Sequence, residues 1–172
     1  MSVHRTKPLS ARPAIGKLVV PTSVVDRTRI LLSQAGSRTP PHEGLIWWLG
    51  RQVGQDTLVV ACHRPPSRSS PDGVFTDEAA AGAAARLARA FRLGVVAQVH
   101  SHPGSDTRHS DGDDELVLMP FEGMFSLVVG DYGAAGMMPD QGACLHQFQH
   151  GQWVLVRQLE PALLPVPAEL TP

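Results

Sequence analysis

The chain is poor in several residue types, and each scarcity excludes a class of protein. Its only two cysteines, Cys62 and Cys144, lie far apart in apolar stretches, which excludes the disulfide framework of a small secreted protein. We expect both to be small buried thiols in a reducing compartment. Charged residues make up 18% of the chain and the net charge is −1. This balance gives no electrostatic footprint for nucleic acid or for an anionic membrane.

Long apolar runs are also missing. No run approaches the roughly 18 residues that a membrane-spanning helix needs, and residues 1–8 lack the apolar core of a signal peptide. We therefore expect a cytoplasmic protein. Lysine is scarce too, at two of the fifteen basic residues, and with abundant Arg, Ala, Pro and Gly this bias weakly indicates a bacterial source.

The remaining composition is that of a globular protein. Hydrophobic residues make up 42% of 172 positions, enough for one domain with a real core. We expect a flexible N-terminal arm at 1–16, a catalytic domain at 17–158 and a Pro-rich C-terminal tail at 159–172. The sequence leaves open whether the tail docks on its own domain or on a partner.

Periodicity and turn residues predict an α/β domain. Seven strand segments are expected, four of them in two hairpins: 18–20, 45–49 with 57–63, 95–102, 125–129, and 143–149 with 152–156. Strand 45–49 is apolar on both faces, which predicts a central position in the sheet. Helices are expected at 22–35, capped by Thr22 or Ser23 and ended by Gly36, from a Thr76 cap to Phe91 with termination at Gly94, and from Ser110 to Leu118. Residues 64–73 are rich in Pro and Ser and predict a mobile loop.

Two histidines lie at the end of the strand expected at 95–102. Side chains alternate faces along a strand, so His100 and His102 point the same way. Two imidazoles in this arrangement are able to bind one metal ion. An ordinary pair of polar strand residues is the alternative.

A carboxylate follows at a spacing that completes a metal site. Ser110 is an expected helix N-cap, and Asp113 lies three residues later on the same face. His100, His102 and Asp113 make three protein ligands, which leaves a fourth zinc position open for water. A structural zinc, closed by His109 as a fourth ligand, is the alternative. Asp111 and Asp114 are either orienting partners of the histidines or solvated acids at a helix start.

The combination His100-x-His102-Pro103, six residues, then Ser110-x-x-Asp113 resembles the signature of the JAMM (MPN+) metalloproteases. That family also has a glutamate upstream, at the start of a strand that ends in glycine. Here Glu43 opens the segment 43–50, which matches in order and spacing. The motifs cover residues 43–113, and flanking elements fit the family's fold from about 17 to 158 by the expected order of strands and helices.

The resemblance implies a fold and a chemistry. The fold would be the MPN (cytidine-deaminase-like) sandwich, with a mixed central sheet and flanking helices. Zinc would be the single cofactor, held by His100, His102 and Asp113. Glu43 would be the general base and Ser110 a hydrogen-bond donor to the water or the developing oxyanion.

The resemblance also implies a substrate. Members of the JAMM (MPN+) family cleave peptide or isopeptide bonds after the C-terminus of ubiquitin or a ubiquitin-like protein. A minimal bacterial member would act in a ubiquitin-like conjugation or antiphage system, beside activating and conjugating enzymes. The alternatives are processing of a sulfur-carrier protein of the same β-grasp fold, a non-catalytic MPN scaffold or binding module, and a zinc hydrolase acting on a small amide.

Overall fold

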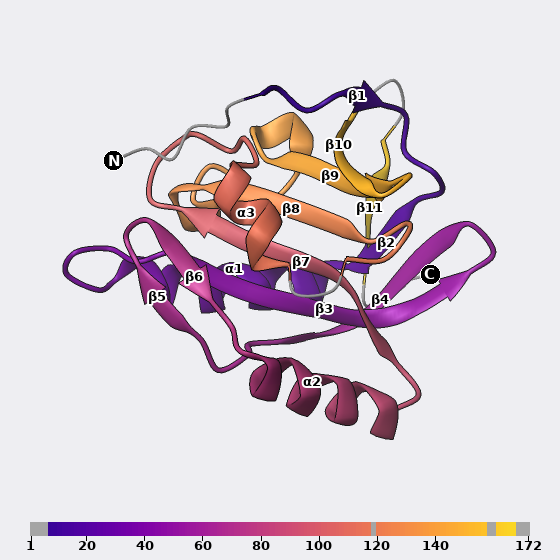
Figure 1. Cartoon of the computed structure of the whole chain (residues 1–172), viewed down its shortest axis with the longest axis horizontal. Coiled ribbons are helices and arrows are strands. Elements are labelled where there is room, and N and C mark those ends of the chain that lie inside the picture. The colour runs from indigo at the N-terminus through magenta and orange to yellow at the C-terminus, as the bar shows by residue number, and fades with distance from the viewer. Residues whose placement is uncertain (1–6, 118–119, 158–160, 168–172) are drawn as a thin grey trace.

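The described part of the chain folds into a nine-stranded mixed sheet with helices on both faces (Figure 1). The computed structural model describes residues 7–117, 120–157 and 161–167. The sheet order is β1-β10-β9-β8-β7-β3-β4-β2-β11, with a separate β5-β6 pair. The elements are β1 (Ala11–Arg12), β2 (Leu18–Pro21), α1 (Thr22–Gly36), β3 (Gly44–Val53), β4 (Asp56–His63), β5 (Arg68–Ser70), β6 (Gly73–Phe75), α2 (Glu78–Ala90), β7 (Gly94–His102), α3 (Asp111–Leu116), β8 (Phe125–Gly130), η1 (Asp131–Gly133), η2 (Pro139–Gln141), β9 (Cys144–Gln149), β10 (Gln152–Val156) and β11 (Leu163–Val166).

Strand β3 is central, as its two apolar faces predict. It pairs antiparallel with β4 on one side and with β7 on the other. Ile46 and Trp48 pack in the main core, which also contains Leu32 of α1. Leu45 and Trp47 pack on the opposite face against Ala84 of α2. Side chains on both faces of the buried part of the strand, residues 45–49, therefore need to be apolar.

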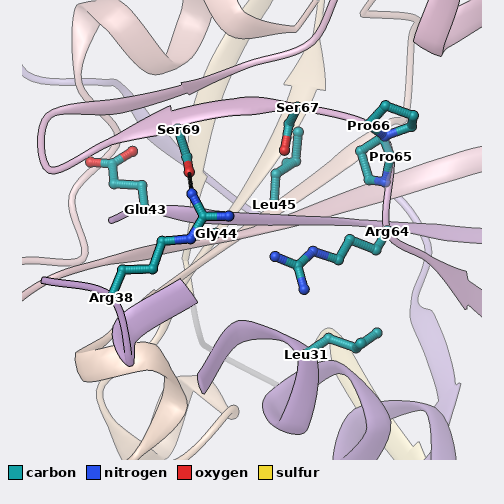
Figure 2. Close-up of a pocket in the computed structure, with 10 residues that line it drawn as sticks. All are labelled: Leu31, Arg38, Glu43, Gly44, Leu45, Arg64, Pro65, Pro66, Ser67 and Ser69. Atoms are coloured by element: carbon teal, nitrogen blue, oxygen red, sulfur yellow. Dashed lines mark hydrogen bonds between the residues drawn. The ribbon is translucent and has the colours of Figure 1, made fainter. Parts of the chain in front are cut away.

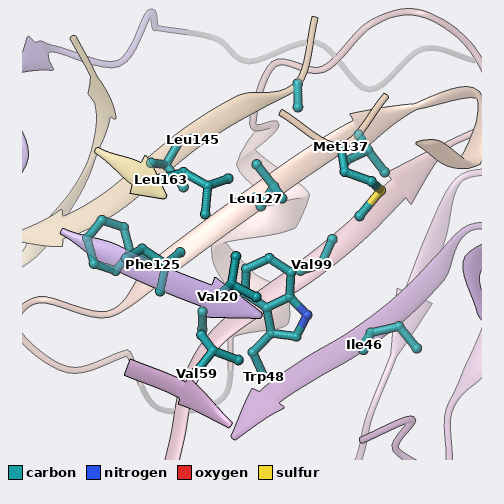
Figure 3. Close-up of a cluster of buried hydrophobic side chains, with 14 of the residues drawn as sticks. Val20, Ile46, Trp48, Val59, Val99, Phe125, Leu127, Met137, Leu145 and Leu163 are labelled. Carbon is teal, nitrogen blue, oxygen red and sulfur yellow. The ribbon is translucent and has the colours of Figure 1, made fainter. Parts of the chain in front are cut away.

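The main core lies between the sheet and α1 (Figure 3). Trp48 and Phe125 are its largest fully buried side chains, and the Trp48 indole donates to Thr28 Oγ1 at 2.8 Å. Burial of each such aromatic or aliphatic side chain contributes roughly 1.5–3 kcal/mol. Met137 is 3% exposed and packs in this core.

Helix boundaries differ from the sequence prediction by one or two residues. Helix α1 begins after Pro21 with no side-chain cap and includes Gly36. The cap of α2 is Asp77, which accepts from Ala80 N, and not Thr76. A carboxylate at this position also interacts favourably with the helix dipole, so it replaces the hydroxyl. Arg92, not Gly94, takes the left-handed conformation after α2, with φ 56°.

The Pro- and Ser-rich segment is not a plain mobile loop. Residues Arg68–Ser70 and Gly73–Phe75 form the antiparallel pair β5-β6. The end of β5 is attached to the main sheet because Glu43 N donates to Ser70 O at 2.9 Å. This long-range hydrogen bond gives order to a stretch whose composition favours disorder.

The predicted N-terminal arm and C-terminal tail each contribute a strand to the sheet of the central domain. β1, in the predicted arm, pairs parallel with β10. β11, in the predicted tail, pairs parallel with β2, so this part of the tail docks on its own domain. Residues 1–6, 158–160 and 168–172 of the arm and tail, and the predicted helix end at Leu118, lie outside the described residues.

Cys62 and Cys144 are both free and half-buried. Within the described ranges, no helix combines the length and apolar character needed to cross a membrane.

Candidate metal centre

The end of β7 carries the first two residues of the site. β7 lies between β3 and β8, with His100 opposite Leu45 and Val128. Alternation along the strand places His100 and His102 on one face, and their Nε2 atoms are 3.3 Å apart. Ser101 points to the other face, where its Oγ accepts from Gly44 N at 3.1 Å. That bond fixes the start of β3 beside the histidines.

Helix α3 brings the carboxylate to these imidazoles. Ser110 is its N-cap and forms a reciprocal capping box with Asp113. Ser110 Oγ accepts from Asp113 N at 3.1 Å, and Asp113 Oδ2 accepts from Ser110 N at 2.5 Å. Asp113 Oδ1 lies 3.2 Å from His100 Nε2, and Oδ2 lies 3.6 Å from His102 Nε2. The predicted cap and the predicted carboxylate are thus one local structure.

These three side chains fit a metal ion by their donor chemistry. Their ligand atoms all lie within 4.8 Å of one another. Zinc binds imidazole nitrogen and carboxylate oxygen at about 2.0–2.2 Å, and tetrahedral ligands at that distance stand about 3.3 Å apart. The two Nε2 atoms are 3.3 Å apart, and Asp113 approaches His100 through Oδ1 at 3.2 Å and His102 through Oδ2 at 3.6 Å, so the donors are close enough to share one ion. Three mutually close nitrogen and oxygen donors are also hard to satisfy by hydrogen bonds alone.

Glu43 lies immediately before β3 and is 7% exposed. Its Oε2 atom is buried and has no hydrogen-bond partner among the residues that the structure describes. Burial raises the pKa of Glu43 to about 7, with nearby His102 opposing and Asp113 and Asp72 adding to the rise. A carboxylate with a pKa near neutrality, coupled to the histidine and aspartate of the cluster, is suited to accept and return a proton.

A backbone carbonyl sets the orientation of His102. His102 Nδ1 lies 2.6 Å from Asp106 O, so Nδ1 is the donor and Nε2 faces the cluster, where it can bind a metal ion once its proton is lost. Arg108 holds Asp106 through two bonds to its carboxylate, which keep the pKa of Asp106 at about 2 although burial opposes them. This loop between β7 and α3 therefore has a defined function in orienting the ring.

Among the residues that the structure describes, the cluster of possible metal ligands contains His100, His102 and Asp113 but not His109. His109 Nδ1 is 2.6 Å from Asp114 Oδ1, and its Nε2 is 3.3 Å from Ser126 Oγ. Both ring nitrogens thus face other groups, which argues against the closed structural zinc. Asp114 therefore supports His109 rather than one of the predicted ligands.

A row of buried rings continues behind the site and was missed in the sequence. The ring of His109 lies 5.8 Å from that of His100, 4.8 Å from that of His146 and 5.3 Å from that of Trp153, between centroids. His146 is 2% exposed, although its strand position alone resembles that of any polar residue. Its only sequence signal is the alternation of β9, which assigns it to a covered face.

Replacing Asp114 with alanine is expected to lower the free energy of unfolding by about 1–3 kcal/mol, because it removes an acceptor from a fully buried imidazole. His109 is 1% exposed, so water cannot readily replace that acceptor. Chemical denaturation of the metal-free protein measures the change. Asp26→Ala, at an exposed carboxylate 3.7 Å from Arg29, is the control and should change stability by less than about 0.5 kcal/mol. Equal stability of the two variants would contradict the expected role of Asp114.

Metal binding is expected to release protons at neutral pH. In the metal-free site burial lowers the pKa of His102, but the hydrogen bond and charge of Asp113 and the charge of Glu43 outweigh it and raise the pKa to about 9. For Asp113 burial raises the pKa, but the charge of His100 and its bonds to both histidines hold it well below its usual range. His102 is therefore protonated at pH 7, and a metal ion needs it neutral.

Calorimetric titration with zinc in buffers of different ionisation heats measures that release. At pH 8 at least about one proton should leave, and the number should rise towards pH 6 as Glu43 also becomes protonated. His150→Asn, at an exposed turn with φ 54° that asparagine tolerates, should give the same values. Heats that are independent of the buffer would contradict a protonated His102.

The fold and the cluster together define an α/β domain with a His-His-Asp cluster, compatible with a metal site, at the end of a central strand. A family model described as "Prokaryotic homologs of the JAB domain" matches residues 26–140. The chain belongs to this family of prokaryotic JAB domains, as its resemblance to the JAMM (MPN+) proteins predicted.

Individual relatives agree with this assignment. A protein of Sinorhizobium fredii named "Probable metalloprotease y4jG" is 28% identical over 128 residues, which cover 72% of this chain and 77% of the relative. The solution structure of protein DSY2949 from Desulfitobacterium hafniense superposes with a TM-score of 0.66, at 17% identity, over 88% of this chain and 95% of its own. A protein from Salinibacter ruber has a TM-score of 0.50 at 20% identity, over 83% and 93%. These two structures confirm the predicted fold.

Proposed function

We propose that the chain is a zinc-dependent peptidase or isopeptidase that cleaves after the C-terminus of a ubiquitin-like modifier. The observation that carries the proposal is the convergence of Glu43, from the start of β3, on the cluster of His100, His102 and Asp113. Membership of the JAB family and similarity to a probable metalloprotease support it. Two imidazole nitrogens and a carboxylate oxygen are ligands that zinc binds, which supports zinc as the proposed ion.

The residues of this chain divide the reaction among them. His100, His102 and Asp113 would hold the ion, which when bound lowers the pKa of water and polarises a carbonyl. Glu43 removes a proton from the attacking water as the new carbon–oxygen bond forms. It then gives that proton to the leaving amine as the carbon–nitrogen bond breaks. The products are a carboxylate on the modifier and a free amine.

We infer that Ser110 stabilises charge during this reaction. Its Oγ already accepts from Asp113 N at 3.1 Å, and a hydroxyl that accepts one hydrogen bond can donate another. A donor directed at the developing oxyanion is typically worth about a hundredfold or more in rate. The capping box fixes the Ser110 side chain relative to Asp113, so the donor and the ion would act on the same carbonyl.

The substrate proposal rests on the surroundings of Glu43. Strand β5 ends at Ser70, whose carbonyl accepts from Glu43 N, so the two-stranded β5-β6 sheet, which has edges of its own, lies beside the proposed base. An extended C-terminal tail is able to add to such an edge by backbone hydrogen bonds. A sulfur-carrier protein with an extended tail would use the same edge, and it is the alternative substrate. Activating and conjugating enzymes are the proposed partners, in a bacterial conjugation or antiphage system in the cytoplasm.

Cleavage of fusion proteins tests the proposal. Ubiquitin-like and sulfur-carrier proteins, each with a C-terminal extension, are incubated with zinc-loaded protein and the products are identified by mass spectrometry. We expect a single cut after the modifier and no cut in the presence of chelator. Turnover of small amides but not of fusions would favour a small-amide hydrolase. Tight, chelator-insensitive binding without turnover would favour a scaffold.

A further inference from the structure

A cavity of about 310 Å³ borders Glu43 on the side of α1. Its polar lining comes from Arg38, Arg64, Ser67 and Ser69, and we call it the arginine cavity. Figure 2 shows both guanidinium groups in the space between α1 and the strand that carries Ser69, with the Glu43 carboxylate to one side. The volume is at the lower end of the range of about 300–1,000 Å³ for small-molecule sites, so the cavity suits a small group.

The two guanidinium groups have neutral partners. Arg38 Nη1 donates to Ser69 Oγ at 3.2 Å and lies 3.3 Å from His42 Nδ1. Arg64 Nη1 donates to Gln34 Oε1 at 3.0 Å. Within the described part of the chain, no ion pair joins either arginine to a carboxylate. Serine and glutamine thus orient two positive charges without neutralising them, and an arginine fork matches the geometry of a carboxylate.

We propose that the arginine cavity binds a carboxylate of the leaving group, held by Arg38 and Arg64. This inference rests on the proposed function, because Glu43 there protonates the leaving amine. A leaving group within hydrogen-bond reach of Glu43 would lie beside the cavity, because Glu43 is part of the cavity's lining. A short C-terminal extension ends in a free α-carboxylate near the scissile bond, and an acidic side chain offers the same chemistry. The cavity therefore favours maturation of a modifier with a short or acidic extension.

Matched extensions separate the two sources of the carboxylate. A modifier fusion that the protein cleaves is prepared with three different extensions after the scissile bond. The extensions are alanine with a free carboxylate, alanine amide and aspartate amide. We expect the KM of the free acid to be at least about tenfold lower than that of alanine amide, as for a charge-assisted hydrogen bond. A low KM for aspartate amide as well would show that a side-chain carboxylate is also accepted. Equal KM values for all three would overturn the proposal.

Variants then assign the preference to the arginines. The double variant Arg38→Gln, Arg64→Gln should raise the KM of the free acid about tenfold or more, leave its kcat within about twofold, and leave the amide unchanged. Arg86→Gln removes a positive charge from an exposed position on α2 and should leave the KM and kcat of both substrates unchanged. Persistence of the acid preference in the double variant would overturn the proposal.

A binding measurement separates failure of this inference from failure of the proposed function. Fluorescein-labelled alanine tripeptides, as free acid and as amide, are titrated into zinc-loaded protein and followed by anisotropy. Tighter binding of the free acid than of the amide, lost in the double variant, supports carboxylate binding in the arginine cavity even if no fusion is cleaved. Absence of any preference overturns it even if cleavage is observed.

Discussion

Replacing Glu43 with glutamine is expected to lower the rate of peptide hydrolysis by about a hundredfold to ten-thousandfold, the usual contribution of a general base. Glutamine keeps the shape of the side chain but cannot accept the proton. Metal binding should be retained, because Glu43 is not one of the three clustered ligands. Steady-state rates and metal stoichiometry measure the two effects. Glu122→Gln, at an exposed carboxylate, is the control and should keep full activity.

The same substitution is expected to stabilise the metal-free protein above neutral pH. Burial raises the pKa of Glu43 to about 7 from an ordinary value of 4.5. A raised pKa gives stability that is fully present below the unfolded value and is lost as pH rises through the folded value. Glu43→Gln should therefore match the wild type near pH 4 and exceed it at pH 8, by up to about 3 kcal/mol. Denaturation at the two pH values measures this, and a variant less stable at pH 8 would contradict the buried, partnerless carboxylate.

Asp113→Asn is expected to abolish metal binding at micromolar zinc and to reduce hydrolysis to the background rate. Asp113 contacts both histidines and also closes the capping box with Ser110. Asparagine keeps the size of the side chain but loses the charge that attracts the ion and raises the pKa of His102. We expect metal affinity to fall by at least about a hundredfold, since one of three protein ligands is lost. Competition with a chromophoric chelator measures the affinity.

The control for Asp113 is Asp140→Asn, an exposed aspartate at the start of η2. It should keep both metal affinity and turnover. Turnover of the Asp113→Asn protein within about tenfold of the wild type would contradict its role as a ligand, because ligand loss should be far more costly.

Local rules were sufficient to locate the site. The two-residue period of a strand predicted that His100 and His102 share a face, and the cap at Ser110 predicted where Asp113 would point. Both signals act within a few residues of the chain, so no knowledge of the fold was needed. The apolar run at 45–49 also predicted a central strand, because only a strand covered on both faces tolerates it.

Features that depend on distant contacts were not predictable in the same way. β11 is a strand because Leu163–Val166 pairs with β2, although its composition indicates a tail. The β5-β6 pair depends on a bond between Ser70 and Glu43, and the arginine cavity depends in turn on that pair. The buried ring of His146 lies against His109, which in turn lies against Trp153, and no local pattern specifies these contacts.

Stepwise zinc addition to metal-free protein tests the central claim most directly. Hydrolysis of a cleavable modifier fusion is measured after each fraction of an equivalent. A single ion held by His100, His102 and Asp113 predicts no activity without zinc, a linear rise to one equivalent and a plateau beyond it. Full activity in the metal-free protein, or no activity at any zinc level with every fusion tested, would contradict the assignment of this site to zinc-dependent proteolysis.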